Sequence, residues 1–320
     1  MLARLCRTLA IASFLLFAGH AMAGNLSIAT GGTAGMYYPY GGALASIWSK
    51  TLSDLNARAE VTGGSVINMA QVVRGDSEVG FSMTDVARDA FTGGGGFPRA
   101  LPVATLFAMY PNYLHAVTRA DSGIAKPEDL KGRTVSLGAP GSGTAVMAEA
   151  VLAAVGVTTD DMDVQRLNFA ETANAIRNGT IDAGFIAAGI NTAAVAELAA
   201  TRDIAIVSFC CGAMDKVHAA NPAYVSGEIP GGVYIGIDEP VEVPAVWNVA
   251  MVNRGMDDDM AYQLTKAAFE NLDELHKVSR AAQATTIENT IAQAVVPIHP
   301  GAARYFREQG SEVPDEMVAK

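Results

Sequence analysis

The chain has 320 residues, half of them apolar, and a formal net charge of −11. This length allows two modest domains with real cores, and this apolar content excludes an intrinsically disordered chain. The acidic balance, without any basic stripe, argues against nucleic acid and against anionic lipid as partners.

The first residues have the pattern of a secretory signal peptide. Arg4 and Arg7 form a basic start, residues 9–18 are apolar, and Ala21-Met22-Ala23 is typical of a cleavage site. We therefore expect residues 1–23 to be removed and the mature protein to be exported to the periplasm. Loss of Arg4 and Arg7 takes the formal charge from −11 to −13. No later apolar run reaches the roughly 18 residues of a membrane span.

Residues 26–42 run from a short apolar strand, through a Gly/Thr loop, into a helix whose first turn is aromatic. Such a loop exposes backbone N–H groups and hydroxyls at a helix N-terminus, where a small anion can be held. The aromatic rings supply an apolar wall beside it. We predict that Thr33, Gly35, Tyr37 and Tyr38 contact a small solute.

Apolar strand-like runs then alternate with helical patterns along the chain. This alternation predicts an α/β protein with parallel sheets covered by helices, and with a more helical C-terminal third that includes residues 258–280. The expected strands are 57–62, 78–83, 133–137, 164–168 and 181–186, and the expected helices are 65–73, 85–90, 144–155, 171–177 and 192–200.

Two further apolar segments, 113–118 and 246–252, are predicted to cross between two lobes. The unit between them begins afresh with a Pro-led turn near residue 127. Lobe one would then contain residues 24–117 and 239–320, and lobe two residues 118–238. Because ligands of open α/β sheets bind at the carboxyl ends of strands, two facing lobes predict a binding cleft.

Two other strand-to-helix turns carry polar side chains. In the turn at 63–68, Ser65 can cap a helix and Asn68 falls on the same face, so both can face a ligand; a plain N-cap with a solvated Asn is the alternative. In the turn at 81–85, Met83 and Thr84 precede Asp85. Asp85 can cap the next helix, or it can pair with a ligand amine or a metal.

The Gly-rich turn at 138–145 has P-loop spacing, but Thr144 stands where the lysine is required, which argues against nucleoside triphosphates. Pro140 argues against a nucleophile elbow, because that motif needs glycine two residues before Ser142. What remains is a helix N-terminus at Ser142, Gly143 and Thr144 that can accept a carboxylate. An ordinary capped turn without a ligand is the alternative.

Export removes Cys6 and leaves the neighbours Cys210 and Cys211. Because a disulfide between adjacent cysteines closes a strained ring, we expect two buried thiols at a strand end. The histidines are scattered and no spacing resembles a zinc site, so we expect neither a metal nor a cofactor.

Six motifs occur in order along the mature chain: Thr30-Gly-Gly-Thr-x-Gly-x-Tyr-Tyr-Pro39, Gly63-Gly-Ser-Val-x-Asn68, Asp129-Leu-Lys-Gly-x-x-Val135, Gly138-x-Pro-Gly-Ser-Gly-Thr144, Asn178-Gly-x-Ile-Asp-Ala183 and His299-Pro-Gly-Ala302. With them the chain resembles the TAXI family, the extracytoplasmic solute receptors of TRAP transporters. The resemblance implies a two-lobed α/β fold like that of type II periplasmic binding proteins, with a hinge and an interlobe cleft. It also implies delivery to TRAP permease membrane subunits driven by an ion gradient. The implied ligands are glutamate, related amino acids or dicarboxylates such as 2-oxoglutarate.

The sequence departs from that family pattern at Ile67, where an acidic residue is frequent, and at Met83, where Gln is frequent. Both changes make the expected site more apolar and favour an oxo- or hydroxy-acid over glutamate. The leading hypothesis is a receptor for a small organic anion that is not an enzyme; the alternatives are an exported α/β enzyme acting on a small carboxylate and an adhesion or signalling protein. The predicted ligand-binding residues are Thr33, Gly35, Tyr37, Tyr38, Ser65, Asn68, Met83, Thr84, Asp85, Ser142, Gly143 and Thr144.

Overall fold

The structure is a computed structural model that describes residues 24–320; the predicted signal peptide, residues 1–23, lies outside the described residues. The strands are β1 (Gly24–Ala29), β2 (Leu55–Glu60), β3 (Val79–Met83), β4 (Val103–Arg119), β5 (Thr134–Ser136), β6 (Asp163–Gln165), β7 (Ala183–Ala188), β8 (Ile204–Ile206), β9 (Val225–Ile229) and β10 (Val241–Asn253). The helices are α1 (Tyr37–Thr51), α2 (Ser65–Arg74), α3 (Thr84–Thr92), α4 (Gly143–Ala154), α5 (Phe169–Asn178), α6 (Ala193–Ala199), α7 (Ala213–Ala220), α8 (Asp258–Phe269), α9 (Leu272–His276), α10 (Ile287–Gln293) and α11 (Pro300–Glu308). Short 3₁₀ turns are η1 (Pro127–Leu130), η2 (Thr159–Asp161), η3 (Arg280–Ala284) and η4 (Asp315–Met317).

The strands form one curled sheet in the order β2-β1-β3-β10-β4-β7-β5-β6, with β8 beside β4 and β9 beside β10. β1 pairs in parallel with β2 and β3, and β5 pairs in parallel with β6 and β7. β4 and β10 run antiparallel to their neighbours and to each other. The expectation of wholly parallel sheets is therefore wrong for these two strands, because each crosses the molecule and meets the strands of both halves.

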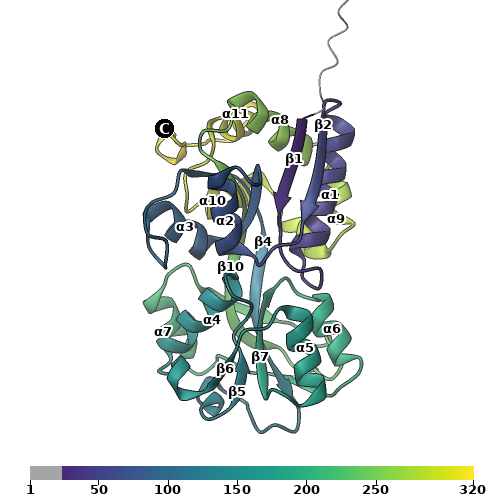
Figure 1. Cartoon of the computed structure of the whole chain (residues 1–320), viewed down its shortest axis with the longest axis vertical. Coiled ribbons are helices and arrows are strands. Elements are labelled where there is room, and N and C mark those ends of the chain that lie inside the picture. The colour runs from purple at the N-terminus through teal and green to yellow at the C-terminus, as the bar shows by residue number, and fades with distance from the viewer. Residues whose placement is uncertain (1–23) are drawn as a thin grey trace, which may run out of the picture.

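The predicted two-lobed α/β architecture is confirmed. Figure 1 shows lobe one, with β1–β3, α1–α3 and α8–α11, above lobe two, with β5–β7 and α4–α7, and it shows β4 and β10 running through both. Along β4 the side chains join the core of lobe one as far as Tyr110 and that of lobe two from Leu114. Along β10 the change falls between Val246 and Val249. Each of the two strands thus passes from the core of one lobe to the core of the other near its middle. The predicted lobe boundaries, 117/118 and 238/239, lie instead near the ends of these strands.

Local chemistry explains the main irregularities. Pro111 lies inside β4 opposite Trp247, beside a register shift, where a missing backbone N–H is tolerated. The helical stretch expected at 258–280 is broken after Phe269, where the Asn271 side chain donates a hydrogen bond to the Ala267 carbonyl. Within residues 24–320 none of the helices combines the length and apolar character of a membrane span.

The two cysteines of the described chain are not where the sequence predicted them. Cys210 and Cys211 are both exposed. They do not end a strand, because β8 stops at Ile206 and the cysteines form the turn that leads into α7. The expectation of two buried thiols is therefore wrong.

Candidate ligand-binding site

A cavity of about 410 Å³ lies between the lobes. Its walls come from the segments that follow β1, β2, β5 and β6, together with the C-terminal ends of β3 and β7 and the middle of β4. The parallel strands of both lobes, β1–β3 and β5–β7, therefore direct their carboxyl ends toward one space, as expected for a ligand site in an open α/β fold. The volume suits a small molecule.

Four helices begin at the cavity wall, two from each lobe. The first residues of α1, α2, α4 and α5 (Tyr37, Ser65, Gly143 and Phe169) all line it. A helix N-terminus carries free N–H groups and about half a positive charge. The positive ends of four helix dipoles therefore face this cavity, and its lining contains no lysine.

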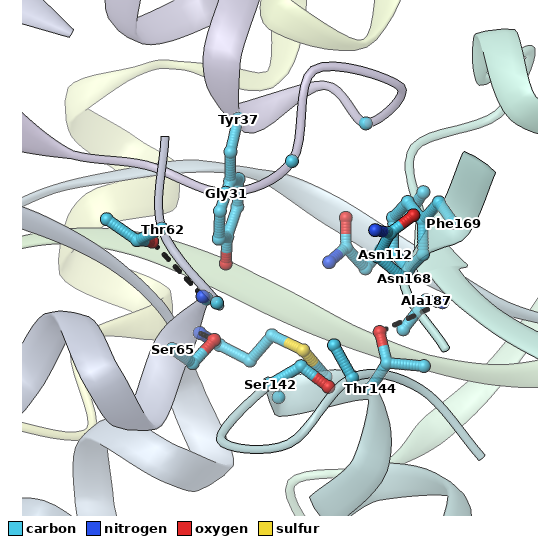
Figure 2. A pocket seen from close by; sticks show the side chains of 18 of the residues that line it. Gly31, Tyr37, Thr62, Ser65, Asn112, Ser142, Thr144, Asn168, Phe169 and Ala187 are labelled. Atoms are coloured by element: carbon cyan, nitrogen blue, oxygen red, sulfur yellow. Dashed lines mark hydrogen bonds between the residues drawn. The ribbon is translucent and has the colours of Figure 1, made fainter. Parts of the chain in front are cut away.

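On the side of lobe two, hydroxyl groups surround the start of α4. The Ser142 Oγ accepts a hydrogen bond of 3.1 Å from the Ala145 N–H and so caps the helix. The Thr144 Oγ1 accepts one of 3.4 Å from the Ala187 N–H of β7. Since both oxygens act as acceptors within the protein, each hydroxyl keeps its proton for a ligand. Figure 2 shows Ser142 and Thr144 side by side at the cavity edge.

On the side of lobe one, Ser65 is buried and its Oγ accepts a hydrogen bond from the Met83 N–H at 3.2 Å. At the hinge, the buried Asn248 of β10 collects three contacts. Its Oδ1 accepts from the Tyr37 hydroxyl at 2.6 Å and from the Asn112 Nδ2 at 3.0 Å, and its Nδ2 donates to the Tyr110 carbonyl. Burial raises the pKa of Tyr37, so its ring stays neutral beside the cavity.

Two charged side chains, Arg166 and Glu171, also line the cavity. Arg166 is paired with Glu149 of α4. The Glu171 carboxylate accepts a hydrogen bond from the Asn168 N–H, while the Asn168 side chain accepts from the Glu171 N–H, which is a reciprocal capping box at the start of α5. Both charged side chains of the wall are thus engaged within lobe two, and the remaining polar groups of the wall are neutral.

The two lobes touch around the cavity. The N–H groups of Val66 and Ile67 in α2 donate to the Gly141 carbonyl of lobe two, at 3.2 and 3.4 Å. On another side the Tyr224 hydroxyl of lobe two donates to the buried Asp85 of lobe one at 2.6 Å, and Arg88 donates to Asn221. The lobes are therefore in a closed arrangement.

The structure brings seven of the predicted site residues to the cavity. These are Gly35, Tyr37, Ser65, Met83, Ser142, Gly143 and Thr144. Their contact with a ligand stays a prediction.

The other five predicted residues lie outside the cavity wall. Thr33 lines a second cavity of about 820 Å³, which shares Gly35 and Met36 with the first. Tyr38 is on the exposed side of α1. Asn68, Thr84 and Asp85 are buried. The Asn68 amide is fully used inside lobe one, because it donates to the Thr30 and Phe81 carbonyls and accepts from Thr62.

The comparison with known families decides how the chain is classified. The model of the NMT1-like family matches residues 28–310. The chain belongs to the NMT1-like family.

Solved structures share the fold of this NMT1-like protein at low sequence identity. PhnD1 from Prochlorococcus marinus (MIT 9301), solved in complex with methylphosphonate, is 11% identical, with a TM-score of 0.56 over 89% of this chain and 98% of that one. A protein of Bordetella bronchiseptica RB50 is 19% identical, with a TM-score of 0.53 over 92% and 91%. A putative L-cystine ABC transporter protein from Listeria monocytogenes is 12% identical, with a TM-score of 0.51 over 81% and 96%. These likenesses establish the fold.

Sequence reasoning missed one side of the site in this NMT1-like protein. Arg166, Asn168 and Phe169 line the cavity, and Figure 2 shows Asn168 and Phe169 near Asn112. The Asn-x-x-Glu capping box at 168–171 is the signal that marks this side of the site. It was missed because residues 164–168 were expected to form a strand, whereas the strand ends at Gln165. Arg74 of α2 and Arg88 of α3 do not line the cavity. Across residues 24–320, acidic, His and Cys side chains form no group of three able to hold a metal ion.

Different effects are expected from Ser142→Ala and Thr144→Val. Each removes a hydroxyl donor from the cavity, which should weaken anion binding by about 1–3 kcal/mol. Ser142→Ala should also lower the free energy of unfolding by about 1 kcal/mol, because it removes the cap of α4. Calorimetry and chemical denaturation measure the two quantities. Unchanged affinity in both variants would show that this turn does not contact the ligand.

Proposed function

We propose that the protein is an extracytoplasmic solute receptor that captures a small organic anion in the cleft between its lobes. The observation that carries the proposal is the meeting of four helix N-termini, two from each lobe, at one interlobe cavity. The signal peptide predicted at residues 1–23 and the NMT1-like family are consistent with it.

Electrostatics explains why an anion suits this cavity. Helix ends of like charge repel one another when closure brings them together, and an anion between them turns this repulsion into attraction. Each dipole contributes about 0.3–1 kcal/mol, and each charge-assisted hydrogen bond about 1.5–3 kcal/mol. Several such contacts are enough for micromolar binding after the cost of association.

The TAXI resemblance supports a glutamate-like amino acid or a dicarboxylate such as 2-oxoglutarate as the ligand. The apolar wall, which includes Met36, Met83 and Phe169, favours an oxo- or hydroxy-acid with few polar groups. PhnD1 was solved with methylphosphonate, a small anion. The ligand-contacting residues we propose are those predicted residues that line the cavity, with Asn112, Arg166 and Asn168 added.

The resemblance also supports TRAP permease membrane subunits as the partner. The structural neighbour from Listeria monocytogenes is named for an ABC transporter, so the energy source needs a direct test. In cells that depend on this receptor, dissipation of the ion gradient should stop uptake of the ligand at unchanged ATP. Uptake that persists until ATP is depleted would assign an ABC-type transporter.

A thermal-shift screen tests the receptor function against the alternative of an exported α/β enzyme. We expect a carboxylate or amino acid to raise the melting temperature and to be recovered unchanged, because a ligand that binds only the native state stabilises it. Conversion of the stabilising compound would support the enzyme. Stabilisation by a neutral sugar or a polyamine alone would contradict the assignment to an anion.

A further inference from the structure

The turn between β8 and α7 places two thiols against each other at the surface. Cys210 and Cys211 are both exposed, and their Sγ atoms are 2.6 Å apart. They are the only cysteines within residues 24–320, so no other thiol of that region competes for either. The cavity between the lobes does not include them.

The backbone of this turn is one that cysteine rarely adopts. The Ala213 N–H donates to the Cys210 carbonyl at 3.2 Å, and both intervening residues have positive φ, 62° at Cys211 and 87° at Gly212. This is the pattern of a type I′ turn, which favours Asn, Asp or Gly at the position of Cys211. Because Cys211 is exposed, packing of its side chain does not offset the cost of its positive φ. An unfavourable backbone conformation retained without such packing points to a role for the thiol itself.

The two thiols interact with each other and with a nearby carboxylate. The hydrogen-bonded contact with the Cys210 sulfur raises the pKa of the Cys211 thiol, and the Glu242 carboxylate adds to the effect. A thiolate is the attacking species in thiol–disulfide exchange.

We propose that Cys210 and Cys211 are a reversible redox-modification site, oxidised to a vicinal disulfide by a disulfide-containing oxidant of the exported compartment. The compartment rests on the proposed function, since disulfides form outside the cytosol. The thiolate of one cysteine attacks the oxidant disulfide, forms a mixed disulfide and releases one oxidant thiol. The other cysteine then loses its proton and attacks the sulfur of the first, which releases the second oxidant thiol. Two S–H bonds are lost, one Sγ–Sγ bond forms, and the oxidant gains two electrons and two protons. Exposure makes this disulfide easy to reduce again.

Intact-mass measurement of the mature protein tests the proposal. After incubation with excess oxidised glutathione, the chain should be lighter by two hydrogen atoms and should take up no maleimide. Dithiothreitol should restore two maleimide labels per chain. Cys210→Ser and Cys211→Ser are matched controls that should retain a single thiol and form at most a glutathione adduct.

Several results would overturn the site. They are retention of both reactive thiols after oxidation, two glutathione adducts on one chain, or covalent dimers in place of the internal bond. The readout does not involve the ligand. Failure of the solute screen therefore leaves the redox site unaffected. Failure of the mass measurement leaves the receptor function unaffected.

Discussion

Gly143→Ala is expected to weaken ligand binding by about 2 kcal/mol, or roughly 30-fold, through overpacking of the closed cleft. Gly143 begins α4 in lobe two and faces lobe one. A Cβ added there would lie 2.5 Å from the Met83 Sδ and 2.6 Å from the Ser65 Oγ. The sulfur can move aside, but Ser65 is held at the start of α2. The lobes must therefore stay further apart, and the ligand loses its contacts to one of them.

The same substitution should leave the lobes themselves stable, because Gly143 does not require a left-handed backbone and alanine is well tolerated in a helix. Gly42→Ala is the matched control, since a Cβ at that helical glycine meets nothing within 4 Å. Calorimetry gives the affinities, and small-angle scattering should show that ligand reduces the radius of gyration less in Gly143→Ala than in the wild type. Equal affinities for Gly143→Ala and wild type would mean that closure at α4 is not needed for binding.

Asp85 should make the protein less stable as the pH rises from about 4 to about 6. Burial raises the pKa of Asp85 to about 6, although the hydrogen bond from Tyr224 opposes the shift. The native state then holds a proton that the unfolded chain releases near its ordinary value of 3.8. The stabilisation is complete below the pKa of Asp85 in the unfolded chain and is lost as the pH rises through the pKa of Asp85 in the native state. A shift of this size corresponds to roughly 3 kcal/mol.

Asp85→Asn isolates this effect. The amide keeps an acceptor for Tyr224 and cannot ionise, so the difference in unfolding free energy between wild type and Asp85→Asn should fall across that pH range. Tyr224→Phe removes the one side-chain donor to Asp85 and should cost more at pH 7 than at pH 4. A difference between wild type and Asp85→Asn that is constant from pH 3.5 to 7.5, or one that grows with pH, would refute the assignment.

The sequence predicted what depends on local chemistry. Strand-to-helix turns with glycine and a hydroxyl marked three of the four helix starts at the cavity, because these residues are selected by backbone geometry and capping. The alternation of short strands and helices identified the α/β class for the same reason. Met83 was also placed in the site, from its position at the end of a strand.

The rest depended on contacts that are distant in the sequence. Asn68 lies in the same turn-to-helix segment as Ser65, but its amide donates to the carbonyl groups of Thr30, just after β1, and of Phe81 in β3. The carboxylate of Asp85 is covered by Tyr224, which lies 139 residues further on. Arg166 and Asn168 were hidden by a strand that ends earlier than its apolar pattern suggested. Sequence periodicity carries no information on which side chain another lobe will cover.

Titration of the mature protein with the carboxylate that stabilises it most, and with the amide of the same compound, tests the central claim most directly. The two ligands have nearly the same shape and differ in charge. The proposed function predicts one carboxylate per chain, an affinity that depends weakly on salt because the contacts are buried, and binding of the amide weaker by about 2 kcal/mol or more. Equal binding of the amide, or selective binding of a sugar or polyamine, would contradict capture of an anion by converging helix N-termini.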